Sequence, residues 1–194
     1  MEKTLSLKDG TQVLIRPMQP NDVDRSLIFF QALPEEDRKY LRRDVTQREV
    51  IKERIKALQT GEVKRLVAVL NDEIIGDGSL ELESYGWKSH ISEIRLIVAR
   101  PFQRQGLGRL LAHELFWLAA AEKVEQVVMK VMSPQVAALK IAERLGFAED
   151  STLSEYVKDQ SGSRQDLIIM RCDLQALMRE MEDVLTDSDF QRSR

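Results

Sequence analysis

Gln103-Arg104-Gln105-Gly106-Leu107-Gly108 is the stretch of this 194-residue sequence that decides its fold. It follows an apolar segment that predicts a strand, and apolar residues at helical spacing follow it. A strand that passes through a glycine turn into a helix leaves backbone N–H groups unpaired at the positive end of the helix. Gly106 and Gly108 have no side chain where an anion would approach, and Arg104 and Arg109 add positive charge. The stretch therefore predicts a site for a diphosphate.

Two other phosphate motifs fit this turn poorly. In a dinucleotide fingerprint that begins at Gly106, the third glycine would fall at Leu111. A nucleotide P-loop requires Gly-Lys-Ser/Thr, which does not follow the turn. Neither motif is therefore favoured.

The segments on either side of the turn predict an α/β (α+β) fold. A helix beginning at Leu107 leads to a strand over Val127–Val131, so this strand should run parallel to the strand over Ile91–Val98. The almost continuous apolar character of Ile91–Val98 suggests a central strand that is covered on both faces. Other strands are expected at 13–16, 66–70, 74–82, 153–157 and 167–171, which gives a mixed sheet of about six to seven strands. Other helices are expected within 20–33, 46–60 and 134–145.

The chain length fits one domain, residues 1–172, followed by a C-terminal helix and frayed tail at 173–194. Asp173 is expected to cap that helix. Its apolar stripe must cover its own sheet or a partner, so docking on the sheet is expected, with a homodimer as the alternative. The stripe consists of Leu174, Leu177, Met178, Met181 and Leu185.

The composition argues against several classes of partner and location. The formal net charge of -3 gives no basic excess for a nucleic-acid or anionic-membrane partner. No segment has the length and apolar character of a signal core or a membrane span, so the cytoplasm is the expected location. His90, His113 and the single Cys172 show no metal-ligand spacing, so no metal is expected.

The glycine turn resembles the Gln/Arg-x-x-Gly-x-Gly/Ala motif of GNAT acetyltransferases. The flanking order also resembles that family, from Ile15-Arg16-Pro17 at the opening to Leu145-Gly146-Phe147 at the end of a late helix. The resemblance covers roughly Val13 to Arg171.

This resemblance implies an N-acetyltransferase that uses acetyl-CoA as co-substrate and an amine as acceptor. It places the CoA pyrophosphate on Gln103 to Arg109. It also implies that the pantetheine arm bonds to the backbone of Leu96, Ile97 and Val98, as an added strand would. Gln135, near the start of the helix after Ser133-Pro134, would hydrogen-bond the cofactor.

Acetyl transfer needs an amine with a free lone pair, so a base is useful. The resemblance makes Glu93 the candidate, and a simple ion pair with Arg95, on the same strand face, is the alternative. Glu81 and Glu83 are weaker candidates for recognition of the amine, because hairpin carboxylates are usually solvated.

Where many family members have a tyrosine that protonates the departing thiolate, this sequence has Ala142, and Tyr156 is the candidate substitute.

Two functions remain open at this point. The first is acetyl transfer from acetyl-CoA to a primary amine of a small molecule, a peptide N-terminus or a protein lysine. The second is a non-catalytic acyl-CoA sensor or interaction domain, which the absent tyrosine and the extra C-terminal helix would permit.

Overall fold

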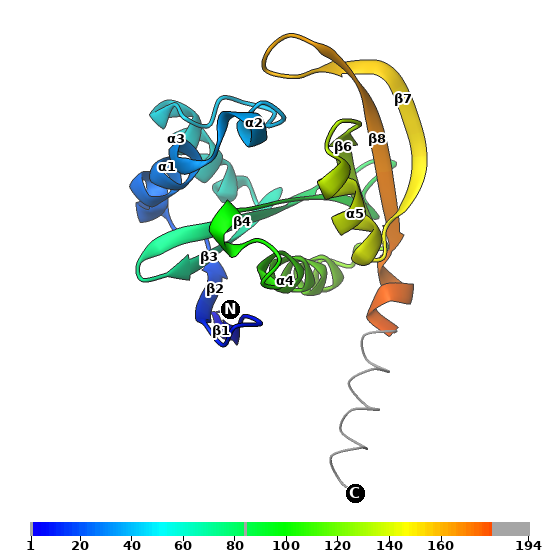
Figure 1. Cartoon of the computed structure of the whole chain (residues 1–194). Coiled ribbons are helices and arrows are strands. Elements are labelled where there is room, and N and C mark those ends of the chain that lie inside the picture. The colour runs from blue at the N-terminus through cyan, green and yellow to red at the C-terminus, as the bar shows by residue number, and fades with distance from the viewer. Residues whose placement is uncertain (1, 84, 180–194) are drawn as a thin grey trace, which may run out of the picture.

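A mixed eight-stranded sheet forms the centre of the computed structural model, which describes residues 2–83 and 85–179 (Figure 1). The strand order is β1-β2-β3-β4-β5-β6-β8-β7, and β5–β6 is the parallel pair in it. The predicted strand–helix–strand crossover is therefore confirmed. The strands are β1 (Lys3–Ser6), β2 (Gln12–Pro17), β3 (Val63–Leu70), β4 (Glu73–Leu82), β5 (Ile91–Val98), β6 (Gln126–Met132), β7 (Ala148–Lys158) and β8 (Arg164–Asp173).

The sheet has one strand more than the six to seven expected, because the sequence analysis missed β1. This edge strand has four residues and pairs with β2 from Lys3↔Ile15 to Ser6↔Gln12. Only Leu5 among its residues is strongly apolar, so no hydrophobic pattern marks the strand. Its pairing with β2 through a turn at Gly10, whose φ is 87°, defines it instead.

Helices cover both faces of the sheet (Figure 1). On one face lie α1 (Val23–Ala32), α2 (Glu35–Arg38) and α3 (Arg48–Lys56), and on the other lies α4 (Leu107–Ala121). Helix α5 (Val136–Arg144) follows β6, and short 3-10 turns occupy Pro20–Asp22, Ala57–Thr60 and Arg100–Phe102. No helix in the described ranges is long and apolar enough to cross a membrane.

Helix α4 packs closely on β4 because two glycines in that strand make room for its leucines. A Cβ at Gly76 would lie 2.8 Å from Leu111 Cδ1, and a Cβ at Gly78 would lie 3.0 Å from Leu115 Cδ1. Both leucines are fully buried. This contact fixes the start of α4 at the end of β5.

One expectation for β5 is confirmed in part. The strand is central and its α4 face is covered, with Ser92 and Ile94 buried. On the other face Ile97 packs against the core beneath α1 and α3, but Glu93 and Arg95 are half-buried, and a cavity lies over Arg95.

The start of the C-terminal helix is confirmed. Asp173 Oδ1 accepts a hydrogen bond from the Ala176 N–H at 2.9 Å, as an N-cap does, and residues 174–179 are helical. Leu174 is buried in the α4-side core, and Leu177 and Met178 pack against it. This part of the stripe therefore docks on its own domain. Met181 and Leu185 lie outside the described residues.

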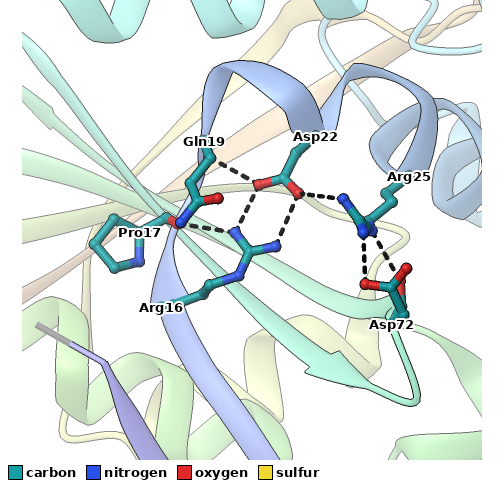
Figure 2. Close-up of polar contacts among 6 residues, drawn as sticks. All are labelled: Arg16, Pro17, Gln19, Asp22, Arg25 and Asp72. Atoms are coloured by element: carbon teal, nitrogen blue, oxygen red, sulfur yellow. Dashed lines mark hydrogen bonds and ion pairs between the residues drawn. The ribbon is translucent and has the colours of Figure 1, made fainter.

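A buried ion pair ties β2 to α1 (Figure 2). The Arg16 guanidinium donates to both oxygens of Asp22 at 2.7 and 2.8 Å, and the Gln19 N–H donates to Asp22 Oδ2 at 2.8 Å. Burial alone would raise the pKa of Asp22, but Arg16, the Gln19 N–H and Arg25 together hold it below its ordinary value. Arg25 also binds Asp72 in the β3–β4 turn, so the cluster joins three segments.

Candidate functional site

Strands β5 and β6 separate partway along their length. They pair from Ile91↔Gln126 to Glu93↔Val128, yet β5 continues to Val98 and β6 to Met132. Beyond Glu93 the edge of β5 that faces β6 therefore has no strand partner among the described residues. The predicted backbone positions, Leu96, Ile97 and Val98, all lie in this open part. The carbonyl of Val98 accepts a hydrogen bond from Gln103 Nε2 at 3.0 Å.

A cavity of about 470 Å³ lies where the two strands separate. Its walls come from β5 and β6 and from the start of α5. Its floor comes from the same face of β3 and β4, and α3 and the segment 40–45 close it from above. Side chains far apart in the sequence thus meet at the open edge of β5.

The glycine turn lies at the end of β5, as predicted. Gly106 has a φ of 93° and precedes the first residue of α4, and Arg104 has a φ of 63°. Gly108, in the first turn of α4, lies beside β5, because a Cβ there would be 3.7 Å from Leu96 Cδ2 and 3.8 Å from Val98 Cγ2. The N–H groups of this first helical turn have no intrahelical acceptors, and both glycines are partly exposed.

Three cationic side chains surround the turn. Arg104 and Arg109, the two cations that the sequence placed near the turn, are exposed. Lys8 also lies there: its N–H donates to the Gln105 carbonyl at 3.0 Å, and its Cγ is 3.7 Å from where a Cβ on Gly106 would be. No sequence signal could have linked Lys8 to this turn, since the β1–β2 connection brings it there.

Two carboxylates lie side by side on β4 and β5, and one of them, Glu81, lines the cavity. Glu81 and Glu93 are cross-strand neighbours on β4 and β5. Glu93 contacts Arg42, Arg95 Nε at 3.0 Å and Lys130 Nζ at 3.0 Å. The ion pair with Arg95 is therefore present, and it is one of three. Arg95 also binds Glu81.

Glu81 differs from the solvated hairpin carboxylate that the sequence suggested. Its side chain is 28% exposed and lines the cavity, whereas Glu83 is exposed. Burial, and then the negative charge of Glu93, raise the pKa of Glu81 above its ordinary value. A carboxylate with a raised pKa is a stronger proton acceptor. The sequence could not reveal this, because the shift depends on the pairing of β4 with β5.

The structure places some of the remaining candidate side chains in the cavity lining and others outside it. Gln135 lines it, and its Oε1 accepts a hydrogen bond from the Met132 N–H at 3.0 Å. Tyr156 is 66% exposed on the irregular part of β7, outside the cavity lining. Tyr40, which the sequence analysis did not select, does line the cavity. Ala142 is fully buried in the α4-side core, so a tyrosine there would have to displace packed side chains.

The β7–β8 loop holds the segment above the cavity in place. Gln160 donates from its N–H to the Lys39 carbonyl at 2.9 Å, and from Nε2 to the carbonyls of Leu41 and Arg43 at 3.0 Å each. Figure 1 shows this loop reaching toward α2. The segment carries Tyr40 and Arg42, so Gln160 fixes both relative to the sheet.

Comparison with known families and structures agrees with this geometry. The sequence profile of the acetyltransferase (GNAT) family matches residues 28–147. A curated relative, L-amino acid N-acetyltransferase AaaT from Escherichia coli (strain K12), is 21% identical over 99 residues. That match covers 48% of this chain and 59% of the relative, so the chain spans less than two thirds of it.

Solved structures share the fold. Ribosomal-protein-S5-alanine acetyltransferase from Vibrio fischeri superposes with a TM-score of 0.74 at 15% identity, covering 88% of this chain and 96% of that one. YncA from Salmonella typhimurium, solved with its cofactor acetyl-CoA, gives a TM-score of 0.70 at 21% identity, covering 84% and 95%. At these identities the likeness shows the fold alone.

Proposed function

We propose that this chain, which belongs to the acetyltransferase (GNAT) family, transfers an acetyl group from acetyl-CoA to a primary amine in the cavity between β5 and β6. The observation that carries the proposal is the joining of two features at one place. The open edge of β5 leads to the glycine turn, and that turn begins α4. Lys8, Arg104 and Arg109 lie around the turn.

Each feature suits one part of acetyl-CoA. The backbone of Leu96, Ile97 and Val98 would bond to the pantetheine amides, and the turn from Gln103 through Gln105, Gly106 and Leu107 to Arg109 would hold the pyrophosphate. Gln135 would bond to the cofactor from the opposite wall. We further propose that residues 1–172 form the acetyl-CoA-binding domain and that 173–194 are an addition to it.

The reaction requires one bond to form and one to break. The amine nitrogen attacks the thioester carbonyl, and a backbone N–H near Val98 stabilises the oxyanion of the tetrahedral intermediate. The C–S bond then breaks, and the CoA thiolate takes up a proton. The proton that the amine loses goes to a carboxylate, directly or through water.

The pair Glu81 and Glu93 is proposed to take up this proton. Glu93, the candidate from the sequence, is held by three cations, so its lone pairs are largely occupied. Glu81 has the raised pKa and lines the cavity. Within the pair, Glu81 is therefore the stronger acceptor, and Glu93 orients Arg42 and Arg95 around it.

Glu81→Gln should lower kcat by about 100-fold near neutral pH, the usual scale of general-base catalysis, with unchanged acetyl-CoA affinity. A base acts only when ionised, so wild-type activity should rise with pH through the raised pKa of Glu81, and the variant should lose this limb. Glu93→Gln should keep most of kcat and move this limb to lower pH, because the negative charge of Glu93 helps to raise the pKa of Glu81. Measuring kcat against pH for wild type and both variants tests these expectations. A hundredfold loss in Glu93→Gln with full activity in Glu81→Gln would return the base role to Glu93.

A tyrosine is proposed to protonate the thiolate, and two tyrosines compete for the role. Tyr40 lines the cavity, whereas Tyr156 is the candidate from the sequence. Tyr40→Phe should lower kcat about tenfold, and Tyr156→Phe should change it less than twofold. Single-turnover kinetics of both variants provide the measurement. The reverse pattern would favour Tyr156, and no effect in either would mean that the thiolate leaves unassisted.

Turnover decides between the enzyme and the acyl-CoA sensor. Thiol release from acetyl-CoA should be measured with small amines, peptides with free N-termini and lysine-containing proteins. Release that depends on an acceptor, with the acetylated product found by mass spectrometry, supports the transferase. Acetyl-CoA binding without release across the panel would favour the sensor.

A further inference from the structure

The floor of the cavity has a row of polar side chains, and the proposed transfer chemistry leaves two of them, Arg65 and Ser79, unused. Arg65 on β3 is the register partner of Ser79 on β4, and Ser79 is the register partner of Arg95 on β5. A serine thus lies between two arginines across three strands of the sheet. Arg54 approaches the same place from α3 and shares Asp77 with Arg65, at 3.1 and 2.6 Å.

This floor contains polar atoms with unmet hydrogen bonds. Arg65 and Ser79 are 8% and 1% exposed, and Asp77 is 4% exposed. Arg54 Nε, Arg65 Nε, Ser79 Oγ and Asp77 Oδ2 are buried, with no hydrogen-bond partner in the part of the chain that the structure describes. Three of these four atoms can donate. Buried donors without partners are costly, so their presence beside a cavity points to a ligand with acceptor oxygens.

The net charge of the cavity also favours an anionic ligand. Six cationic side chains line it, and they face three lining carboxylates and a fourth, Glu93, that contacts three of the cations. The excess is two positive charges. Burial and the nearby charge of Arg65 lower the pKa of Arg54, against the attraction of Asp77. An anionic group placed there would supply the missing charge.

We propose that the acceptor amine carries a carboxylate, as a free amino acid does, and that Arg54 and the Arg65–Ser79 part of the floor bind this carboxylate. This inference rests on the proposed acetyl transfer and names the class of its acceptor. The carboxylate would sit on the floor, while the amino group reaches the end of the cavity near Glu81. The cavity volume of about 470 Å³ suits a small zwitterion beside the thioester.

The test compares acceptors that differ only in the carboxylate. Standard L-amino acids, their carboxamides and the corresponding decarboxylated amines should be assayed by thiol release. We expect kcat/KM for the acids to exceed that for the carboxamides by about 100-fold, because a site built for charged hydrogen bonds rejects an analogue that cannot form them. Carboxamides have the less basic amine, so at neutral pH intrinsic reactivity alone would favour them. Equal or better use of carboxamides would overturn the inference and leave acetyl transfer standing.

Arg54→Gln tests the site itself. Arg54 also lowers the pKa of Glu81, so the variant and wild type should be compared at a pH where Glu81 is ionised in both. There the variant should raise KM for the acids about 30-fold, change kcat/KM for the carboxamides less than twofold, and leave acetyl-CoA affinity unchanged. Arg65 still pairs with Asp77 in this variant, so the protein should fold, which a melting curve would confirm. Arg54→Lys should restore part of the affinity. Lys52→Gln is the matched control, because Lys52 lies on the same helix, is exposed and lies outside the cavity lining.

A binding measurement separates failure of the inference from failure of the proposed function. If no acceptor is acetylated, acetyl transfer fails for this panel. Calorimetric titration of the acetyl-CoA-loaded protein with the same acids and carboxamides then decides the inference alone. Binding that is selective for the acids and weakened in Arg54→Gln would uphold the carboxylate site, and binding without selectivity, or none, would overturn it.

Discussion

Replacing Gly108 with glutamate is expected to weaken acetyl-CoA binding about 1000-fold, since like charges placed in contact cost several kcal/mol. The new carboxylate would stand in the first turn of α4, where the pyrophosphate is proposed to bind. It would also occupy the space beside Leu96 and Val98 that the glycine leaves open. Calorimetric titration with acetyl-CoA measures the loss.

The fold should survive this change. Gly108 does not have a positive φ, and a Cβ there would make ordinary contacts of 3.7 and 3.8 Å. An acidic residue in the first turn of a helix also interacts favourably with the helix dipole. Gly108→Ala is the matched control, and its affinity should stay within about threefold of wild type because the alanine adds no charge. A Gly108→Glu protein that melts normally and binds acetyl-CoA as tightly as wild type would remove the pyrophosphate from this turn.

Asp22→Asn should lower the free energy of unfolding by about 3–5 kcal/mol, the usual cost of leaving one partner of a buried ion pair unpaired. Asp22 is fully buried and accepts two hydrogen bonds from Arg16 (Figure 2). Asparagine keeps the size of the side chain but not its charge, so the Arg16 guanidinium would remain buried without a counter-ion. Chemical denaturation measures the change, and the melting temperature should fall by about 10 °C.

The exposed Asp24→Asn is the control for this variant. Asp24 lies in the first turn of α1, two residues after Asp22, and pairs with Arg48 at the surface, so its loss should cost less than about 0.5 kcal/mol. The pH dependence gives a second check. The folded pKa of Asp22 is lowered, so its contribution is complete above the ordinary value of 3.8 and disappears as the pH falls below it. The Asn variant should lack this part of the acid transition. Equal stability of wild type and Asp22→Asn at neutral pH would contradict the importance of the pair.

The sequence by itself determined the part of the fold that is encoded locally. The apolar run at Ile91–Val98, the glycines of the turn and the leucine spacing of α4 follow one another along the chain, so hydrophobic periodicity and backbone chemistry sufficed to predict a strand, a glycine turn and a helix. Asp173 as a helix cap was predictable for the same reason. In each case the interacting groups are separated by a few residues only.

The tertiary structure decided which side chains meet in the cavity. Arg42 and Lys130 contact Glu93 from distant segments on either side of it in the sequence, and Lys8 lies beside the turn at Gly106. The raised pKa of Glu81 and the row of Arg65, Ser79 and Arg95 likewise depend on the order and register of the strands. A residue's own neighbours in the sequence set its backbone conformation, but the charges around its side chain come from strands and helices that only folding brings together. The glycine turn and the helix it begins were therefore predictable from the sequence, whereas the partners of the carboxylates and the cationic floor were not.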